Sequence, residues 1–138
     1  MDSTRVTAFS QGDSPERWSE YDEFRWAQEL LDQRRPGRAV PVLETLLTQV
    51  RESAPEQVGV VRAELARAYF HAARLGAAEE LAREAFDADP TDAQAGVLLA
   101  RVLQRRSRHT EAAALLPRLE ALLGPAHESM VCLRERAR

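Results

Sequence analysis

The sequence predicts an all-α protein built from repeated pairs of antiparallel helices. Three observations indicate this class: apolar residues recur at helical spacing, one hairpin pattern returns along the chain, and the apolar residues are mostly small. Hydrophobic residues make up 44% of the 138 residues but aromatic residues only 6%, so Ala, Leu and Val must form the core. Such residues suit closely packed helices, and the chain is long enough for one domain with a core of its own.

The clearest hairpin pattern runs from Gly59 to Pro90. Apolar residues from Val60 to Ala73 share one broad helical face, and a second amphipathic stretch runs from Ala77 to Ala88. Leu75-Gly76 is the predicted turn between the two helices. The second helix is expected to end before Pro90, because proline disfavours the α conformation of the residue that precedes it.

This hairpin pattern returns in both directions along the chain. One period forward, Leu65-Ala66 corresponds to Leu99-Ala100 and Ala78 to Ala112. Backward, Trp26-Ala27 takes the place of Leu65-Ala66 after a slip of about five residues. The predicted repeats are approximately residues 18–52, 56–90 and 91–124, followed by a closing helix at approximately 126–136.

Large and small residues follow a fixed order in the central hairpin: Leu65-Ala66, Tyr69, Ala78, Ala85 and Asp89-Pro90. This order is similar to the tetratricopeptide repeat (TPR), a helical hairpin of about 34 residues. The resemblance implies three such repeats and a C-terminal capping helix, wound into a right-handed superhelix of antiparallel helix pairs, an α-solenoid. It also implies that the first helix of each pair lines a concave groove that binds another protein.

Residues 1–13 are predicted to form a disordered tail, and residues 14–138 a single TPR-like domain. Asp13 or Ser14 is the expected cap of the first helix, which runs from Trp18 to Arg34. Pro36-Gly37 is the predicted turn after it.

Two further helix starts are predicted from capping patterns. Ser53 and Glu56 have the spacing of a capping box before the second repeat, and Thr91 and Gln94 repeat the pattern before the third.

The predicted groove residues share positions between repeats. Arg67 and Arg101 occupy one repeat position, and His71 and Arg105 occupy the position one turn later. Because arginine binds a carboxylate through two parallel hydrogen bonds, an acidic peptide segment is the expected ligand. Self-association is the alternative, because the aromatic first helix is acidic and the last third of the chain is basic. The predicted groove set is Tyr21, Phe24, Gln28, Leu31, Arg67, Phe70, His71, Arg101, Gln104 and Arg105.

A third alternative is that the N-terminal tail, with Val6 and Phe9, occupies the groove until a partner displaces it. The same groove would then bind a segment of the chain itself.

Catalysis, cofactors and metal ions are not expected. His71, His109 and His127 lie at unrelated repeat positions, and no glycine-rich phosphate loop or paired histidine motif is present. The single cysteine, Cys132, allows no internal disulfide and is predicted to be a buried, small apolar residue.

Charge and hydropathy also bear on whether the chain binds nucleic acid or a membrane. A formal net charge of −3 gives no reason to expect nucleic acid, and no apolar run is long enough to span a bilayer. The N-terminus lacks a signal-peptide pattern, which predicts a cytoplasmic protein. All 19 basic residues are arginine, which we interpret as the coding bias of a GC-rich bacterial genome. The sequence thus predicts a non-catalytic adaptor that binds a protein or peptide segment.

Overall fold

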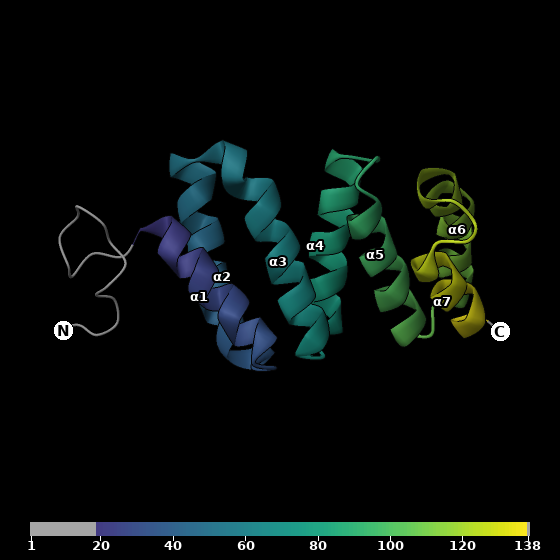
Figure 1. Cartoon of the computed structure of the whole chain (residues 1–138), viewed down its shortest axis with the longest axis horizontal. Helices are drawn as coiled ribbons and strands as arrows, with labels where there is room; N and C mark the ends of the chain where they lie inside the picture. The colour runs from purple at the N-terminus through teal and green to yellow at the C-terminus, as the bar shows by residue number, and fades with distance from the viewer. Residues whose placement is uncertain (1–18, 138) are drawn as a thin grey trace. The chain divides into compact units, whose positions relative to one another are not determined.

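A computed structural model describes residues 19–137 and confirms the all-α class (Figure 1). This part of the chain contains no strand. The predicted tail and the predicted cap at Asp13 or Ser14 lie outside the described residues. The helices are α1 (Glu20–Asp32), α2 (Pro36–Ser53), the 3₁₀ turn η1 (Pro55–Gln57), α3 (Val58–His71), α4 (Leu75–Ala88), α5 (Ala93–Arg105), α6 (His109–Leu123) and α7 (Glu128–Arg136).

Among the described residues, consecutive helices pack against one another within two compact units, residues 19–64 and 65–137. In the first unit α1 packs against α2. In the second unit α5 packs between α4 and α6, and α7 contacts both α5 and α6. The boundary between the units lies inside α3, and thus inside the predicted second repeat. The division into a tail and one domain therefore stays a prediction.

The three hairpin turns have the same backbone geometry. Each contains one non-glycine residue in the left-handed region, at Arg34, Ala73 and Ser107, with φ of 61°, 62° and 62°. Ala73 and Ser107 are separated by the predicted repeat length of about 34 residues, and the longer interval from Arg34 contains the predicted slip. An arginine N–H then donates at 2.8 Å in each turn: Arg35 to the carbonyl of Leu30, Arg74 to Tyr69, and Arg108 to Leu103.

Both predicted turn dipeptides belong to helices instead. Pro36-Gly37 begins α2 and Leu75-Gly76 begins α4. Proline fits the first helical position because its φ is already helical and it lacks only an N–H that has no partner there. The bend lies just before, at the left-handed residue.

The predicted capping box at Ser53 and Glu56 is wrong. Ser53 is the last residue of α2, its hydroxyl lies 3.0 Å from Glu20 Oε2, and no side chain caps η1. The serine pattern therefore coincides with a helix end followed by the 3₁₀ turn.

The predicted cap of α5 is wrong by one residue. Asp92, not Thr91, is the N-cap, and its Oδ1 accepts from the N–H of Ala95 at 3.2 Å. Thr91 instead donates its hydroxyl to Asp89 at 2.6 Å. A capping box that was not predicted starts α1, where Ser19 and Asp22 cap each other's backbone.

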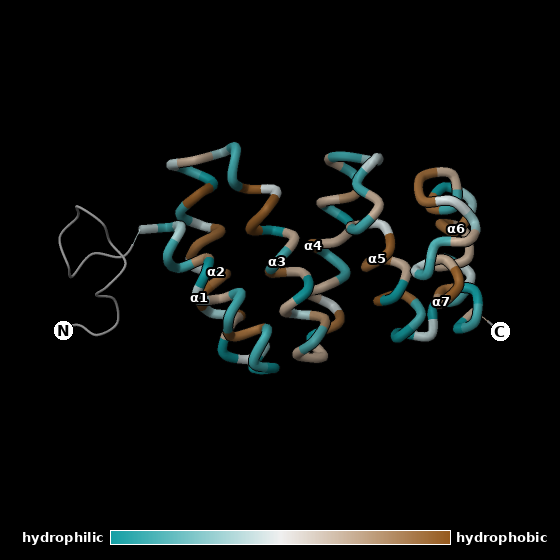
Figure 2. The backbone as a smooth tube through the Cα atoms, viewed as in Figure 1, coloured by the Kyte–Doolittle hydropathy of each residue, from teal (hydrophilic) through white to brown (hydrophobic). Residues whose placement is uncertain are grey.

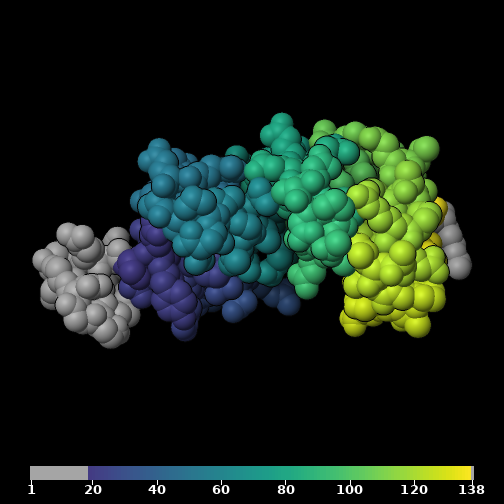
Figure 3. Space-filling view, turned by 90° about the horizontal axis from the view of Figure 1, so that it is seen from above, coloured from purple at the N-terminus to yellow at the C-terminus, as the bar shows by residue number. Residues whose placement is uncertain are grey.

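Each unit has its own apolar interior, and apolar and polar stretches alternate along the helices (Figure 2). In the first unit the buried side chains include Ala27, Leu30, Val40, Leu43 and Leu47. In the second unit the atoms of α4 to α7, green to yellow in Figure 3, form a continuous packed surface. Beneath it lies a cluster of Ala82, Phe86, Leu99, Ala100, Leu103, Ala112, Leu119, Met130 and Leu133.

Gly96 allows α5 to approach its neighbours closely. A Cβ atom at this position would lie 2.5 Å from Leu119 Cδ2 and 2.9 Å from Phe86 Cε1. Both side chains are buried, so neither has space to move away. In the described part of the chain, no helix is both long and apolar enough to span a membrane.

Candidate functional site

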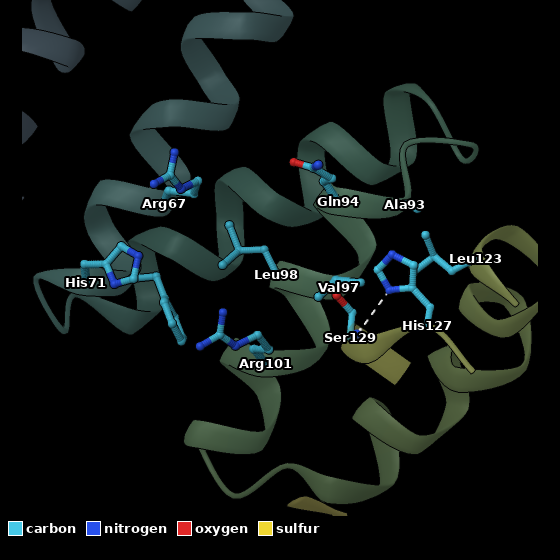
Figure 4. Close-up of a pocket in the computed structure, with 11 residues that line it drawn as sticks. Arg67, His71, Ala93, Gln94, Val97, Leu98, Arg101, Leu123, His127 and Ser129 are labelled. Carbon is cyan, nitrogen blue, oxygen red and sulfur yellow. Dashed lines mark hydrogen bonds between the residues drawn. The ribbon is translucent and has the colours of Figure 1, made fainter. Parts of the chain in front are cut away.

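A surface hollow of about 230 Å³ lies in the second unit (Figure 4). Three helices and one helix end supply its walls: α3, α5, the start of α7 and the last residue of α6. Figure 4 shows Leu98 between Arg67 and Arg101, with His127 and Ser129 on the far side. The lining residues are Arg67, Phe70, His71, Ala93, Gln94, Val97, Leu98, Arg101, Leu123, His127 and Ser129.

The cationic wall of the hollow is built on one aromatic ring. Phe70 is 4% exposed, and the guanidinium of Arg101 lies 4.7 Å from its ring centroid. Arg105, one turn further along α5, lies 5.3 Å from the same ring, and His71 meets it edge-on at 5.5 Å. Arginines over an aromatic face are attracted by its negative potential, and this stacking limits their rotation.

Arg101 is surrounded mainly by positive charge. Burial lowers the pKa of its half-buried guanidinium, and the charges of Arg136 and Arg105 lower it further. Within the part of the chain that the structure describes, Arg101 has no carboxylate partner, and no acidic residue lines the hollow. Such a site favours an anionic group, which would relieve the repulsion among the arginines.

His71 lies at the same wall. Burial lowers its pKa, and the charges of Arg67 and Arg101 lower it further. The neutral imidazole is thus favoured in the folded protein, and a nearby anion would shift the pKa upward.

His127 lies at the opposite side of the hollow and caps α7. Its Nδ1 accepts a hydrogen bond from the N–H of Ser129 at 3.1 Å (Figure 4). Since Nδ1 is the acceptor, the neutral ring carries its proton on Nε2. The cap fixes the start of α7 beside the apolar part of the hollow.

The predicted groove residues of the second unit are only partly brought together. Arg67, Phe70, His71 and Arg101 line the hollow, and Arg105 lies beside them on Phe70. Of these, Arg67 and Arg101 share one repeat position. Gln104 does not line it, because its Nε2 donates to the carbonyl of Leu133 at 2.9 Å and so ties α5 to α7.

The other four predicted groove residues lie on α1, in the first unit. Tyr21 is 64% exposed and accepts a hydrogen bond from Arg25 at 3.2 Å. Gln28 donates to Glu64 at 3.3 Å, and Phe24 and Leu31 are half-buried.

Repeat positions did not identify the opposite wall. Leu123 lines the hollow from the end of α6, and His127 and Ser129 line it from the start of α7, after the last hairpin. His127 has no counterpart in the other repeats, so repeat positions do not indicate it. The only sequence signal was the predicted closing helix itself, whose start could have been placed against α5.

A second polar cluster centres on Glu79, which is 8% exposed. Its Oε1 accepts from Arg106 at 2.8 Å and from Arg108 at 2.7 Å, and its Oε2 accepts from Arg83 at 2.9 Å. Burial raises the pKa of Glu79, but the hydrogen bond from Arg83 and the charges of the three arginines outweigh burial and lower it. This cluster ties α4 to the α5–α6 turn and is satisfied internally, which indicates a structural role.

The prediction of a buried Cys132 is wrong, since this side chain is exposed. It lies on α7, where Met130 and Leu133 occupy the buried positions. Among residues 19–137, no group of three or more His, Cys, Asp or Glu side chains is arranged to hold a metal ion.

Comparison with known proteins does not assign the chain to a family. No protein-family model matches the chain, and a search of curated proteins found no match.

Proposed function

We propose that the chain is a non-catalytic adaptor whose second unit binds an acidic segment of another protein. The proposal includes a TPR-like superhelical arrangement of the hairpins and a cytoplasmic location in a bacterium. The recurring turn geometry and the residue order of the central hairpin support the helical-repeat part of this proposal.

One observation carries the binding part. Arg101 is half-buried, stacked on Phe70, and without a carboxylate partner among the described residues. Holding a cation among other cations is unfavourable unless an anion compensates it, and a guanidinium can form two parallel hydrogen bonds to a carboxylate. The apolar lining beside it is typical of a binding recess for another molecule.

Charge reversal at Arg101 tests the proposal. The matched control is Arg118→Glu, because Arg118 stacks on Phe86 at 4.6 Å, nearly as Arg101 does on Phe70, but lies outside the hollow. Proteins captured from the native cytoplasm by the wild type are identified, and their affinity is measured with purified components. We expect Arg101→Glu to weaken binding by at least tenfold, corresponding to the loss of about 1.5–3 kcal/mol for a charged hydrogen bond.

The control should bind like the wild type. Equal loss in both variants would indicate a general charge effect and contradict a role for the hollow. Unchanged binding by Arg101→Glu would exclude this surface as the recognition site.

Self-assembly is the second candidate, favoured by the acidic first turn of α1. Glu20, Asp22 and Glu23 lie there, opposite in sign to the wall around Arg101. Light scattering at low salt distinguishes the two functions: a wild-type dimer that Arg101→Glu abolishes supports self-assembly, and a monomer at high concentration contradicts it.

A further inference from the structure

We propose that the hollow binds one apolar side chain of the partner, with a carboxylate of an adjacent partner residue paired to Arg101. This inference rests on the proposed function and specifies its ligand: an acidic segment carrying a leucine- or phenylalanine-sized anchor.

The floor of the hollow is apolar although its rim is polar. Val97, Leu98 and Leu123 are all half-buried and line it together with the ring of Phe70. Leaving these surfaces in a hydrated recess is unfavourable, and an apolar side chain that displaces the water gains the corresponding free energy. An ion alone would leave this floor uncovered.

The size of the hollow limits what can enter. A volume of about 230 Å³ corresponds to roughly eight water molecules and lies below the range of about 300–1,000 Å³ found for drug-sized ligands. One large apolar side chain fits this space.

The arrangement of charge places the acidic group next to the anchor. Leu98 lies between Arg67 and Arg101 in Figure 4, so a side chain seated on Leu98 has cationic groups on both sides. Arg101 is fixed by its stacking on Phe70, and His71 stands beside the same ring. A glutamate or aspartate next to the anchor can therefore reach a guanidinium without displacing the anchor.

Three synthetic peptides test the inference against the full-length protein. Their ends are blocked, and their sequences are Glu-Glu-Leu-Glu-Glu, Glu-Glu-Ser-Glu-Glu and Gln-Gln-Leu-Gln-Gln. Binding is followed by NMR titration of the backbone amides. We expect the acidic leucine peptide to bind about tenfold more tightly than either of the others, and to shift the amides of Val97, Leu98 and Arg101.

Filling the hollow provides the matched variant. Ala93 lines the hollow at the start of α5, so Ala93→Leu should occupy the space of the anchor. Ala114→Leu, on an exposed position of α6, is the control. We expect Ala93→Leu to reduce the advantage of the leucine peptide over the serine peptide to about onefold, and Ala114→Leu to leave it unchanged. Circular dichroism verifies that both variants fold.

The outcomes separate this inference from the proposed function. Equal binding of both acidic peptides, lost in Arg101→Gln, would overturn the anchor and leave the acidic-segment proposal in place. Equal binding of the acidic and glutamine-flanked leucine peptides would overturn the carboxylate pairing. Absence of binding by all three would overturn both.

Discussion

Arg101 shows how one residue type acquires different properties from its surroundings. Arg101 and Arg118 are both stacked on phenylalanine rings, at 4.7 and 4.6 Å. Arg101, however, stands half-buried beside two further arginines whose charges lower its pKa. The repeat position singles out Arg101, but the sequence does not show which charges surround either arginine. The difference lies in the neighbouring charges that the fold brings to Arg101.

The pKa of His71 should respond to the positive charge of the neighbouring arginines. The charge of Arg101 is one of the causes that lower it, so Arg101→Gln should raise the pKa toward its ordinary value near 6.5. The rise should be partial, because burial is the largest cause and remains. NMR titration of the imidazole resonances measures it. Arg118→Gln, the control, should leave the pKa unchanged, and an equal rise in both variants would contradict a local effect.

Glu79 should contribute to stability through its three arginine partners. Glu79→Gln removes the charge but keeps the shape, and we expect it to lower the free energy of unfolding by about 1–3 kcal/mol. The low end is favoured because the arginine side chains are 38–44% exposed and therefore screened by water. Urea denaturation measures the change, with the exposed neighbour substitution Glu80→Gln as control.

The contribution of Glu79 should also depend on pH. Its pKa is lower in the folded protein than its ordinary value of 4.5, so its stabilisation is present above pH 4.5 and is lost as pH falls through the folded-state pKa. The stability difference between wild type and Glu79→Gln should therefore shrink in acid. A difference that stays constant from pH 7 to pH 3 would contradict the ionic origin.

At the scale of the helix, close approach depends on single small residues. Gly96→Ala should destabilise the protein by about 1–3 kcal/mol, although alanine favours helix formation, because the added methyl group overlaps Leu119 and Phe86. Gly59→Ala on α3 is the control, since nothing lies within 4 Å of its Cβ position, and it should stabilise slightly. Thermal unfolding of the two variants measures the contrast, and stabilisation by both would show that α5 has room to move.

Helix boundaries show what the sequence predicts and what it leaves open. The all-α class and the closing helix follow from apolar periodicity, which reflects burial over many residues. The predicted turns are misplaced because Pro36-Gly37 and Leu75-Gly76 have the composition of turn dipeptides, whereas the left-handed residues are Arg34 and Ala73. Hydrogen bonds within the hairpin outweigh the local backbone preference there.

The candidate site was predictable only where the repeat determines it. Arg67 and Arg101 occupy equal repeat positions, and the structure brings both to one hollow. The positions of His127 and Ser129 at the hollow depend on the path of the chain between α6 and α7, and this connection has no counterpart in the repeats. Gln104 has a repeat position that predicts a groove residue, but its side-chain amide donates a hydrogen bond to the carbonyl of Leu133.

At the scale of the whole molecule, the net charge of the chain differs in sign from the charge of the residues that line the hollow. The chain carries a net charge of −3, yet no acidic residue among those described lines the hollow. At about 0.1 M salt, charges more than roughly 10 Å apart are largely screened, so an approaching acidic segment senses the arginines of the hollow more than the distant acids. A negative chain can therefore bind an acidic partner.

Closure of the second unit by α7 should couple its stability to binding. Leu133 is 1% exposed in the cluster shared with α5 and α6, so Leu133→Ala should cost about 2–5 kcal/mol of unfolding free energy. Val131→Ala, at a 42% exposed position of the same helix, is the control and should change stability by less than about 0.5 kcal/mol.

Leu133→Ala should also weaken peptide binding at the hollow. His127 and Ser129 hold the start of α7 at its edge, so loosening α7 should weaken binding of the acidic leucine peptide even where the protein remains folded. NMR titration at a temperature well below the unfolding transition measures this effect. If Leu133→Ala lowers stability but binds the peptide like the wild type, then α3, α5 and the end of α6 form the binding surface, and the wall supplied by α7 is dispensable.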